Sequence, residues 1–387
     1  MRICMLIPRF YPVMGGTENQ CRLLSKQLFK MGHGVFVLTQ REKNTAAYET
    51  LDGVDVYRLP GFAFPGIFSF GFFFSALFFL FSNRVKYDLI HVHLATSAAL
   101  AAVLIAAILG KGCVVKFAGA GRTGDIGTSC GKPWGRLKLY ILKKSRALFT
   151  APSDEVASEL LGAGFNKESV VKISNGVECS YYSPLPQDER AALRKEMRWG
   201  GKKVFLFAGR LEEPKDIAFF LEAWASSSDE RGLFVIAGGG SQEKALRALA
   251  EKKKIKNIVF AGKRNDILRF YRAADYFVLP SRAEGLSNAL LEAMACGLTV
   301  MASGIPANRE VIEDGKDGFL FSFDDPERLK GIIKSLFSDG SADKAAADRA
   351  PSASAHSMAD AAREKIIRNY SISAAADNHV SKVYGRF

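Results

Sequence analysis

The sequence alternates short apolar runs with helical patterns along most of its length. Runs such as 34-GVFVLTQ-40 and 203-KVFLFA-208 are rich in β-branched and aromatic residues, and segments with helical spacing separate them. This alternation is typical of βαβ units, in which strands pair in parallel and helices cover the sheet. Turn residues and prolines accumulate around 175-NGVECSYYSPLPQ-187, after which the pattern starts again. The sequence therefore predicts an α/β protein with two doubly wound, Rossmann-like domains.

The expected boundaries follow from this restart. The chain of 387 residues is too long for one ordinary core, and its 48% hydrophobic and 24% charged residues are typical of a globular protein. We expect a first domain over 1–180, a second over 181–365 and a final helix over 366–387. The small, polar stretch 338–357 predicts a turn. Sheets of this kind bind ligands at the carboxyl ends of their strands, so we expect the chemistry in a central cleft that both domains face.

The charge of the chain points to an anionic partner. Lys and Arg exceed Asp and Glu by 13, which suggests a phosphorylated substrate, an anionic membrane surface or a nucleic acid. The basic residues are scattered and accompany no nucleic-acid-binding module, so nucleic acid ranks last. Six cysteines lie far apart without a CxxC pair, which favours reduced thiols over disulfides or a zinc site. The first apolar run is too short for a signal peptide, and we expect a cytoplasmic protein.

One segment is unusually apolar. Residues 61–82 carry no charge and contain ten of the 29 phenylalanines. Pro65 and Gly66 interrupt the segment, and the 15 residues that remain from Ile67 to Phe81 make a helix of about 22 Å, which is too short to span a bilayer comfortably. Two interpretations stay open: a helix buried against the sheet, or an interfacial helix that contacts the inner face of a membrane through 62–81.

The stretch 284-EGLSNALLE-292 places one glutamate in a loop and another in a helix. Ser287 is a good N-cap, and the spacing predicts a helix from Asn288 to a stop at Gly297. The N–H groups near this start, at Gly285, Leu286, Ser287 and Asn288, suit an anion. Glu292 lies one turn beyond Asn288, so it can accept hydrogen bonds from a ribose, while Glu284 reaches another part of the ligand.

Other strand ends carry glycines and cations. Gly15 and Gly16 follow the first strand and precede the first helix, where they would let a phosphate approach the backbone. Arg210 and Lys215 follow the first strand of the second domain, and two cations there can neutralise a diphosphate leaving group. Taken singly, the glycines indicate a tight turn, and the two cations indicate ordinary surface residues.

Together these motifs resemble glycosyltransferase family 4, whose members have the GT-B fold, use nucleotide sugars and retain the anomeric configuration. The matching stretches, in the order of the family, are GGTE (15–18), HVH (91–93), SNGV (174–177), GRLEEPK (209–215), IAGGG (236–240), VFAG (259–262), 280–300 and DGKDGFL (314–320). The resemblance implies that Arg210 and Lys215 hold the donor diphosphate, Glu292 the ribose and Glu284 the transferred sugar. It also implies that Gly238 contacts the donor, that main-chain groups near Lys263 contact the base, and that the final helix returns to the first domain.

The chain departs from the family pattern at two positions. Asp216 stands where a glycine is usual, and Ala118 stands where many members have a histidine after a strand of the first domain. That second change puts a histidine contact with the donor in doubt, and 119-GAGRTGDIG-127 becomes a candidate for sugar or acceptor contacts through Asp125. Glu18 and His93, in the GGTE and HVH motifs, are the other acceptor-side candidates.

The expected reaction is transfer of a hexose from a UDP- or GDP-sugar to an acceptor hydroxyl, such as that of a lipid-linked or cell-surface glycan precursor. No paired carboxylates stand near the cations, so we expect a reaction without a metal or other cofactor, in which fixed cations and a helix N-terminus stabilise the leaving group. Two rivals stay open on the same scaffold: a nucleotide-sugar epimerase, and a non-catalytic nucleotide-sugar sensor or scaffold.

Overall fold

The computed structural model describes residues 1–13, 15–61, 68–337 and 355–387. It divides into two compact units: Met1–Gly176 together with Tyr370–Phe387, and Val177–Asn369. The sequence-based boundaries at 180 and 365 differ from these by a few residues. The predicted turn at 338–357 lies outside the described residues up to 354, and it is wrong for 355–357, which begin a helix over Ala355–Asn369. The part of the Phe-rich segment at 62–67 also lies outside the described residues.

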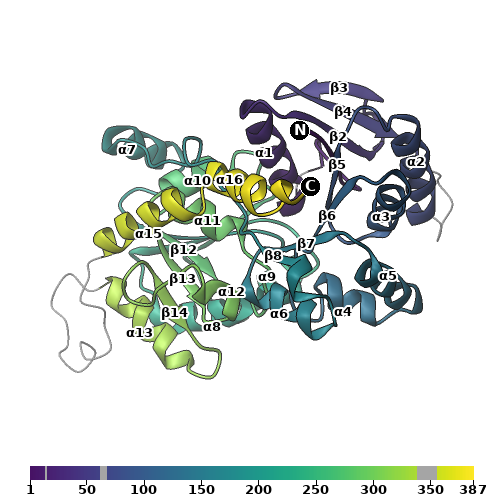
Figure 1. Ribbon diagram of the computed structural model, residues 1–387. Coiled ribbons are helices and arrows are strands. Elements are labelled where there is room, and N and C mark those ends of the chain that lie inside the picture. Colours follow the sequence, from purple (N-terminus) through teal and green to yellow (C-terminus); the bar gives the residue numbers. More distant parts are fainter. Residues whose placement is uncertain (14, 62–67, 338–354) are drawn as a thin grey trace. The chain divides into compact units, whose positions relative to one another are not determined.

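The first unit is built on one sheet. Among its described residues, eight strands lie in the order β3-β4-β2-β1-β5-β6-β7-β8 (Figure 1). All neighbours are parallel except β3 and β4. The strands are β1 (Arg2–Leu6), β2 (Gly34–Gln40), β3 (Tyr48–Leu51), β4 (Val54–Leu59), β5 (Leu89–His93), β6 (Gly112–Lys116), β7 (Leu148–Ala151) and β8 (Val170–Lys172).

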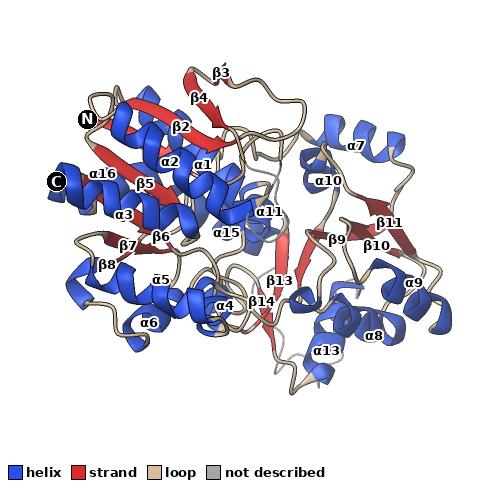
Figure 2. Ribbon diagram, turned by 90° about the vertical axis from the view of Figure 1, so that its right-hand side faces the viewer, coloured by secondary structure: helices blue, strands red, loops and turns tan. Residues whose placement is uncertain are grey.

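Helices cover both faces of this sheet, as the alternation of the sequence predicts (Figures 1 and 2). They are α1 (Gly16–Lys30), α2 (Phe68–Ser82), α3 (Ser97–Leu109), α4 (Asp125–Cys130), α5 (Pro133–Lys144), α6 (Asp154–Gly162) and α16 (Ile372–Lys382). Successive residues of β1 point to opposite faces: Cys4 and Leu6 join one core cluster, and Ile3 and Met5 join the other.

The second unit repeats this architecture. Among its described residues, six parallel strands lie in the order β11-β10-β9-β12-β13-β14. They are β9 (Lys203–Ala208), β10 (Gly232–Ala237), β11 (Ile258–Gly262), β12 (Tyr276–Leu279), β13 (Thr299–Ser303) and β14 (Phe319–Phe321). The helices are α7 (Gln187–Glu196), α8 (Ile217–Ser227), α9 (Glu243–Lys252), α10 (Ile267–Ala273), α11 (Asn288–Ala295), α12 (Pro306–Arg309), α13 (Pro326–Phe337) and α15 (Ala355–Asn369).

The Phe-rich segment forms α2, whose two sides have different surroundings. Phe72, Ala76 and Leu80 are buried at i, i+4 spacing in the core shared with α3 and the sheet, whereas Phe74 and Phe78 are exposed. The helix therefore has a core face and an exposed apolar face. Of the helices that the structure describes, none is long and apolar enough to cross a membrane.

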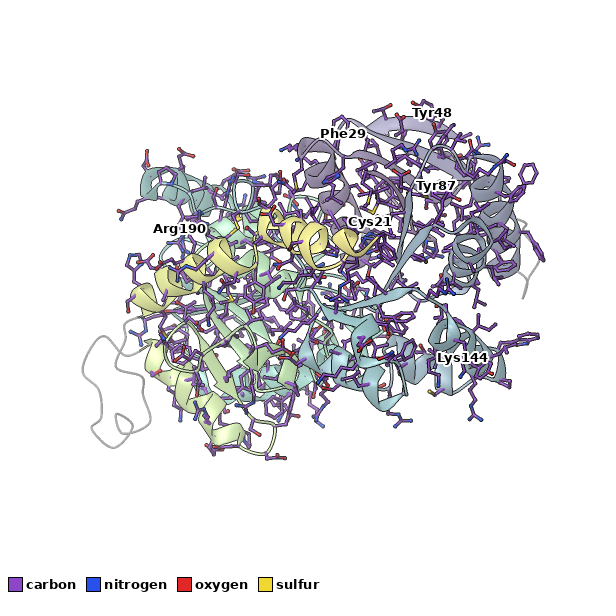
Figure 3. All side chains as sticks on the ribbon, in the orientation of Figure 1. Cys21, Phe29, Tyr48, Tyr87, Lys144 and Arg190 are labelled. Carbon is purple, nitrogen blue, oxygen red and sulfur yellow. The ribbon has the colours of Figure 1, made fainter. Side chains whose placement is uncertain are left out.

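The six cysteines are free thiols, as their spacing predicts. Cys4, Cys21, Cys113 and Cys296 are buried, and Cys130 is exposed. Figure 3 shows Cys21 on α1 beside α16, where both helices contribute to one core cluster. The four buried thiols therefore act as small core residues.

Candidate functional site

Four neighbouring strands of the second unit end beside one another. β11, β10, β9 and β12 are adjacent and parallel, so their carboxyl ends lie at one edge of the sheet. The loops that follow them carry, in that order, the predicted residues Lys263, Gly238, Arg210 and Glu284. We call this the carboxyl edge of the second sheet. It is the candidate functional site.

Lys215 and Glu284 contact each other across two of these loops. Lys215 ends the short 3₁₀ helix η2 (Glu213–Lys215) after β9, and its Nζ forms an ion pair with Oε1 of Glu284 after β12. The side chains are only 21% and 11% exposed, so solvent screens the pair less than it would a surface pair. Because the residues are 69 positions apart, the contact depends on β9 and β12 being neighbours. The fold thus brings together two of the three predicted catalytic residues.

Arg210 lies two residues beyond β9 and is exposed. Beside it, the backbone N–H and hydroxyl of Ser241 donate to the carboxylate of Glu212 at 3.2 and 2.6 Å. These hydrogen bonds, with the nearby Arg210 charge, lower the pKa of Glu212. Among the described contacts, none joins Arg210 to Glu284. Arg210 therefore supplies a positive charge at the edge without belonging to the Lys215–Glu284 pair.

Asp216 follows Lys215 in a left-handed backbone conformation, with φ of 38°. Glycine adopts this conformation most easily, which is a physical reason for the glycine expected here; Asp tolerates it better than most residues. Its carboxylate accepts a hydrogen bond from the N–H of Phe219 at 3.3 Å, which caps α8, and pairs with Nε of Arg282 at 2.6 Å. The change from glycine therefore adds a second ion pair between the β9 and β12 loops.

The glycines after β10 are required by packing. A Cβ on Gly238 would lie 1.8 Å from the carbonyl oxygen of Gly209, and one on Gly240 would lie 2.4 Å from that of Leu211. The backbone N–H of Leu211 also donates to the carbonyl of Gly239 at 3.1 Å. Contact between the β9 and β10 loops thus accounts for Gly238, and its donor-binding role stays a prediction.

Lys263 is exposed just beyond β11. The preceding Gly262 has φ of 68°, a left-handed turn that ends the strand. The side chain of Lys263 lies beside Gly239 in the β10 loop. The structure thus places Lys263 next to the β10 loop at this edge, and contact of the main chain near it with the nucleotide base stays a prediction.

The start of α11 lies at the same edge. Gly285, Leu286 and Ser287 are buried, and Ser287 Oγ accepts a hydrogen bond from the N–H of Leu290 at 3.4 Å. Ser287 is therefore the N-cap and Asn288 the first helical residue, which confirms the helix start predicted from the sequence. A helix start concentrates N–H groups and partial positive charge, which here lies within a few residues of Glu284.

Glu292 lies on α11, where two tyrosines hold its carboxyl group. The hydroxyl of Tyr271, on α10, donates to Oε2 at 3.1 Å, and the hydroxyl of Tyr182 also bonds to it. Burial raises the pKa of Glu292 to about 7, against the effect of the two hydrogen bonds. Neither tyrosine belongs to a recognised motif, so sequence reasoning missed both. The ribose contact of Glu292 stays a prediction.

In the first unit, Gly15 and Gly16 lie at the start of α1 and are exposed. The carboxylate of Glu18 folds back over this start, because a Cβ on Gly15 would lie 2.2 Å from its Oε2. Glycine at position 15 leaves room for that carboxylate. The negative charge sits where a phosphate would approach the helix start, so phosphate binding at Gly15 and Gly16 requires Glu18 to move.

His93 ends β5 and is fully buried. Its ring stacks on that of His91, with 4.5 Å between centroids, and both of its ring nitrogens are without a hydrogen-bond partner in the described part of the chain. Burial and the nearby Lys116 charge lower the pKa of His93 well below its usual value, so the ring is neutral. Its predicted acceptor contact stays untested, since the ring lies in the core of the first unit.

Asp125 begins α4 and organises the loop after β6. Its Oδ2 accepts hydrogen bonds from the backbone N–H groups of Ala118 at 2.7 Å and Gly119 at 3.1 Å. This is the loop in which Ala118 replaces the expected histidine. Asp125 therefore has a structural role there, and an acceptor contact stays a prediction.

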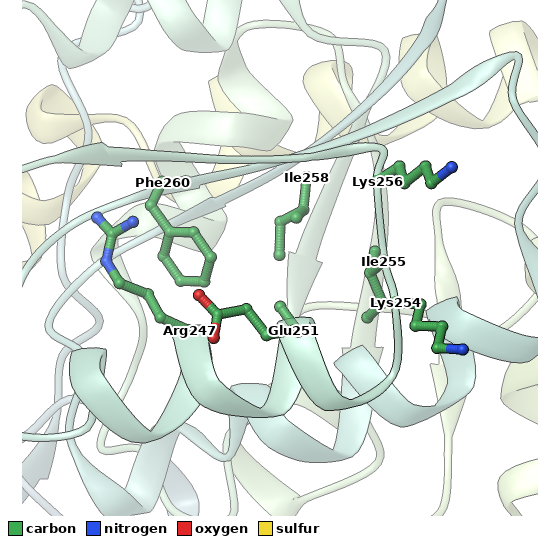
Figure 4. Close-up of a pocket in the computed structure, with 8 residues that line it drawn as sticks. Arg247, Glu251, Lys254, Ile255, Lys256, Ile258 and Phe260 are labelled. Carbon is green, nitrogen blue, oxygen red and sulfur yellow. The ribbon is translucent and has the colours of Figure 1, made fainter.

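The described residues contain no cluster of metal ligands, and one hollow lies away from the predicted site. No group of three or more His, Cys, Asp or Glu side chains among them could hold a metal ion. A hollow of about 350 Å³ lies beside α9 and β11 (Figure 4). It is lined by residues such as Arg247, Glu251 and Phe260, and none of the predicted site residues lines it.

Two family models match the chain and together span most of it. Residues 14–181 match the family described as Glycosyltransferase Family 4, and residues 189–353 match Glycosyl transferases group 1. The chain is 24% identical over 349 residues to alpha-monoglucosyldiacylglycerol synthase of Streptococcus pneumoniae, covering 83% of this chain and 75% of the relative. It is 29% identical over 254 residues to the UDP-Gal:alpha-D-GlcNAc-diphosphoundecaprenol alpha-1,3-galactosyltransferase of Escherichia coli, covering 63% and 64%.

Solved structures share the fold across the whole chain. Anabaena Alr3699/HepE, whose structure was determined in complex with UDP and glucose, is similar with a TM-score of 0.80, 16% identity and complete coverage of both chains. WaaG, a glycosyltransferase involved in lipopolysaccharide biosynthesis, is similar with a TM-score of 0.75 and 16% identity, covering 98% of this chain and 99% of WaaG. At these identities the likeness establishes the architecture.

Proposed function

Since the chain belongs to the glycosyltransferases of GT-B fold, with a Glycosyltransferase Family 4 segment followed by a group 1 segment, we propose that it transfers a hexose from a UDP- or GDP-sugar to an acceptor hydroxyl, with retention. The observation that carries this proposal is the contact of Lys215 with Glu284 at the carboxyl edge of the second sheet, beside the start of α11. The complexes of HepE with UDP and with UDP-glucose support a nucleotide-sugar donor.

Each charged group has a role in this proposal. An ammonium has three N–H donors, so Lys215 can hold Glu284 with one and diphosphate oxygens with the others. Arg210 and the N–H groups at the start of α11 add positive charge where the leaving group accumulates negative charge. Glu284, held by Lys215, would accept hydrogen bonds from hydroxyls of the transferred sugar.

The proposed reaction is a front-face displacement. The bond between the anomeric carbon and the phosphate oxygen breaks, and the acceptor oxygen forms a bond to the same face of that carbon. A phosphate oxygen of the leaving nucleoside diphosphate takes the acceptor proton. Because Arg210, Lys215 and the helix start supply fixed positive charge, we expect transfer to proceed in the presence of EDTA.

The acceptor proposed is a lipid-linked glycan or glycolipid at the inner face of a membrane. The names of two relatives support a lipid acceptor, since one refers to a diacylglycerol and the other to a diphosphoundecaprenol. The exposed phenylalanines of α2 and the net positive charge support contact of the protein with a membrane.

A transfer assay tests the proposal. UDP- and GDP-sugars with a labelled hexose are incubated in EDTA with membrane lipid extract, and label in the organic phase is measured. We expect one donor to give a labelled lipid with the anomeric configuration of the donor, and Glu284→Gln to lower kcat by about 100-fold or more. Glu230→Gln, an exposed residue before the amino end of β10, is the control and should match the wild type. Absence of labelled lipid with every donor, or inversion of configuration, would refute the proposal.

A further inference from the structure

Three neighbouring helices of the first unit expose large apolar side chains. α2 exposes Phe74 and Phe78, which are 61% and 76% accessible, and α3 exposes Ile108, which is 69% accessible. On α5, Trp134 is 72% and Tyr140 58% accessible. Isolated exposed apolar residues are ordinary, but several large ones on adjacent helices are not.

These side chains occupy one layer of the unit. Figures 1 and 2 show α2, α3 and α5 side by side on one face of the first sheet, and α3 packs against both of the others. Each helix buries its other side: Phe72 on α2, Ala106 on α3 and Leu139 on α5 belong to the core. Folding of the unit therefore does not account for the outward-facing residues. We call this outward layer the α2–α3–α5 face.

Cations border the face. Residues 61–146 contain eleven Lys and Arg, of which Lys116 is buried at the end of β6, but only two acidic residues, Asp88 and Asp125. Asp88 pairs with Arg2, and Asp125 accepts the two main-chain hydrogen bonds after β6, so neither is committed to the exposed cations. The guanidinium of Arg84 lies over the ring of Phe81, 5.5 Å from its centroid, which joins the basic border to the apolar stripe.

Several of these cations lie at the carboxyl ends of the three helices. α2, α3 and α5 each connect parallel strands in the order β4, β5, β6, β7, so they run the same way and their carboxyl ends lie at one edge. Arg84 and Lys86 follow α2, Lys111 follows α3, and Lys144 and Arg146 end or follow α5. Lys144 is labelled in Figure 3 and is exposed. Cations favour helix carboxyl ends in any protein, but that preference does not account for the apolar residues beside them.

We propose that the α2–α3–α5 face docks on the surface of an anionic lipid bilayer. Aromatic and aliphatic side chains would enter the interfacial layer while the lysines and arginines contact lipid phosphates. A bilayer fits better than a second copy of the chain, because two such faces would bring like charges together around the contact. This docking rests on the proposed function, and it extends the membrane contact proposed there from α2 to α3 and α5.

Vesicle sedimentation with the full chain tests this docking. We expect binding to phosphatidylglycerol-rich vesicles, weak binding to pure phosphatidylcholine, and weakening by salt. The triple variant Phe78→Ser, Ile108→Ser, Trp134→Ser should bind about tenfold more weakly or worse, as should Lys144→Glu with Arg146→Glu. Leu161→Ser, an exposed leucine on α6 of the same unit, is the control and should bind as the wild type does.

Several results would overturn the docking. One is a triple variant that binds vesicles as tightly as the wild type, and another is equal binding of the wild type to both kinds of vesicle. A third is a dimer of the wild type that the triple variant does not form, which would assign the face to a second copy of the chain. Titration with UDP and GDP keeps this test separate from the proposed function, because the variants lie outside the nucleotide site. Vesicle binding without any sugar transfer would leave the docking standing and refute only the transferase proposal.

Discussion

The carboxyl group of Glu292 shows how much of a site depends on contacts that no motif contains. Its position in the EGLSNALLE stretch is readable from the sequence, and so is the helix that carries it. Its two partners are not, since Tyr182 lies in the connection before α7 and Tyr271 on α10. The sequence thus predicts the position of Glu292 but not the ionisation behaviour of its carboxyl group.

This environment predicts a pH dependence of donor binding. The pKa of Glu292 is raised to about 7, so the carboxylate that would accept ribose hydrogen bonds is lost as the pH falls through 7. We expect affinity for the donor nucleotide sugar to fall about tenfold from pH 8 to pH 6, measured by calorimetry. A nucleotide sugar is the suitable ligand because both ends of its diphosphate are esterified, so it lacks a phosphate that titrates near pH 6.

Two variants identify the titrating group. Glu292→Gln should remove the pH dependence. Tyr271→Phe removes a hydrogen bond that favours the carboxylate, so the midpoint should move above pH 7. Tyr276→Phe, which alters a tyrosine on β12 of the same unit, should leave the midpoint unchanged. Constant affinity of the wild type for the donor between pH 6 and 8 would show that the ribose is not bound by an ionised Glu292 carboxylate.

At the scale of elements, strongly patterned segments are predictable and weakly patterned ones are not. β2 spans Gly34–Gln40, the full apolar run visible in the sequence, and α11 begins where its cap predicts. The sequence does not indicate β3, because this antiparallel edge strand has no buried residue and pairs on one side alone. The sequence does not indicate α7 either, because this helix has no buried residue and lacks an apolar stripe.

The element α16 carries part of a buried histidine cluster. The ring of His379 lies 5.3 Å from that of His91, and the hydroxyl of Tyr384 lies 2.7 Å from Nδ1 of His91. Burial lowers the pKa of His379 to about 3 and those of His91 and His93 well below the usual value. Lys116, whose own pKa is lowered to about 8 by burial, donates to Asn175 at 2.6 Å and adds repulsion to any protonated ring.

This cluster predicts that acid loosens α16. Unfolded histidine takes a proton near pH 6.5 while the folded rings stay neutral, so stability is present above that pH and is lost as the pH falls below it. Each such histidine contributes up to about 1.4 kcal/mol per pH unit. The protection factors of α16 amides in hydrogen exchange, which are taken relative to the intrinsic rate at each pH, should therefore fall between pH 7 and pH 5.

A matched pair of variants checks this assignment. His379→Gln should reduce the acid sensitivity of α16, because one titrating ring is gone. His356→Gln, at an exposed histidine of α15, should not change it. If α16 is equally protected at pH 7 and pH 5 in the wild type, the histidine cluster does not govern its stability.

At the scale of the whole molecule, both units present their predicted residues at the carboxyl ends of parallel strands. In the second unit this rule unites four loops at one edge, and the 69-residue separation of Lys215 and Glu284 becomes a direct contact. In the first unit the same rule is less informative: His93 is buried, and Glu18 and Asp125 are engaged by their own helix starts and loops. Parallel pairing can be anticipated from βαβ alternation, but burial of a polar side chain depends on packing that the sequence does not display.

The proposed function requires the carboxyl edge of the second sheet to bind a nucleoside diphosphate. Titration calorimetry of UDP and GDP with the wild type, Lys215→Ala and Lys252→Ala tests this most directly. Lys252 is the control because it is the last residue of α9, at the opposite edge of the sheet. We predict that one of the two nucleotides binds the wild type. It should bind the Lys215→Ala variant at least about tenfold more weakly, and the Lys252→Ala control as tightly as the wild type. Equal affinity for all three proteins, or no binding by either nucleotide, would contradict it.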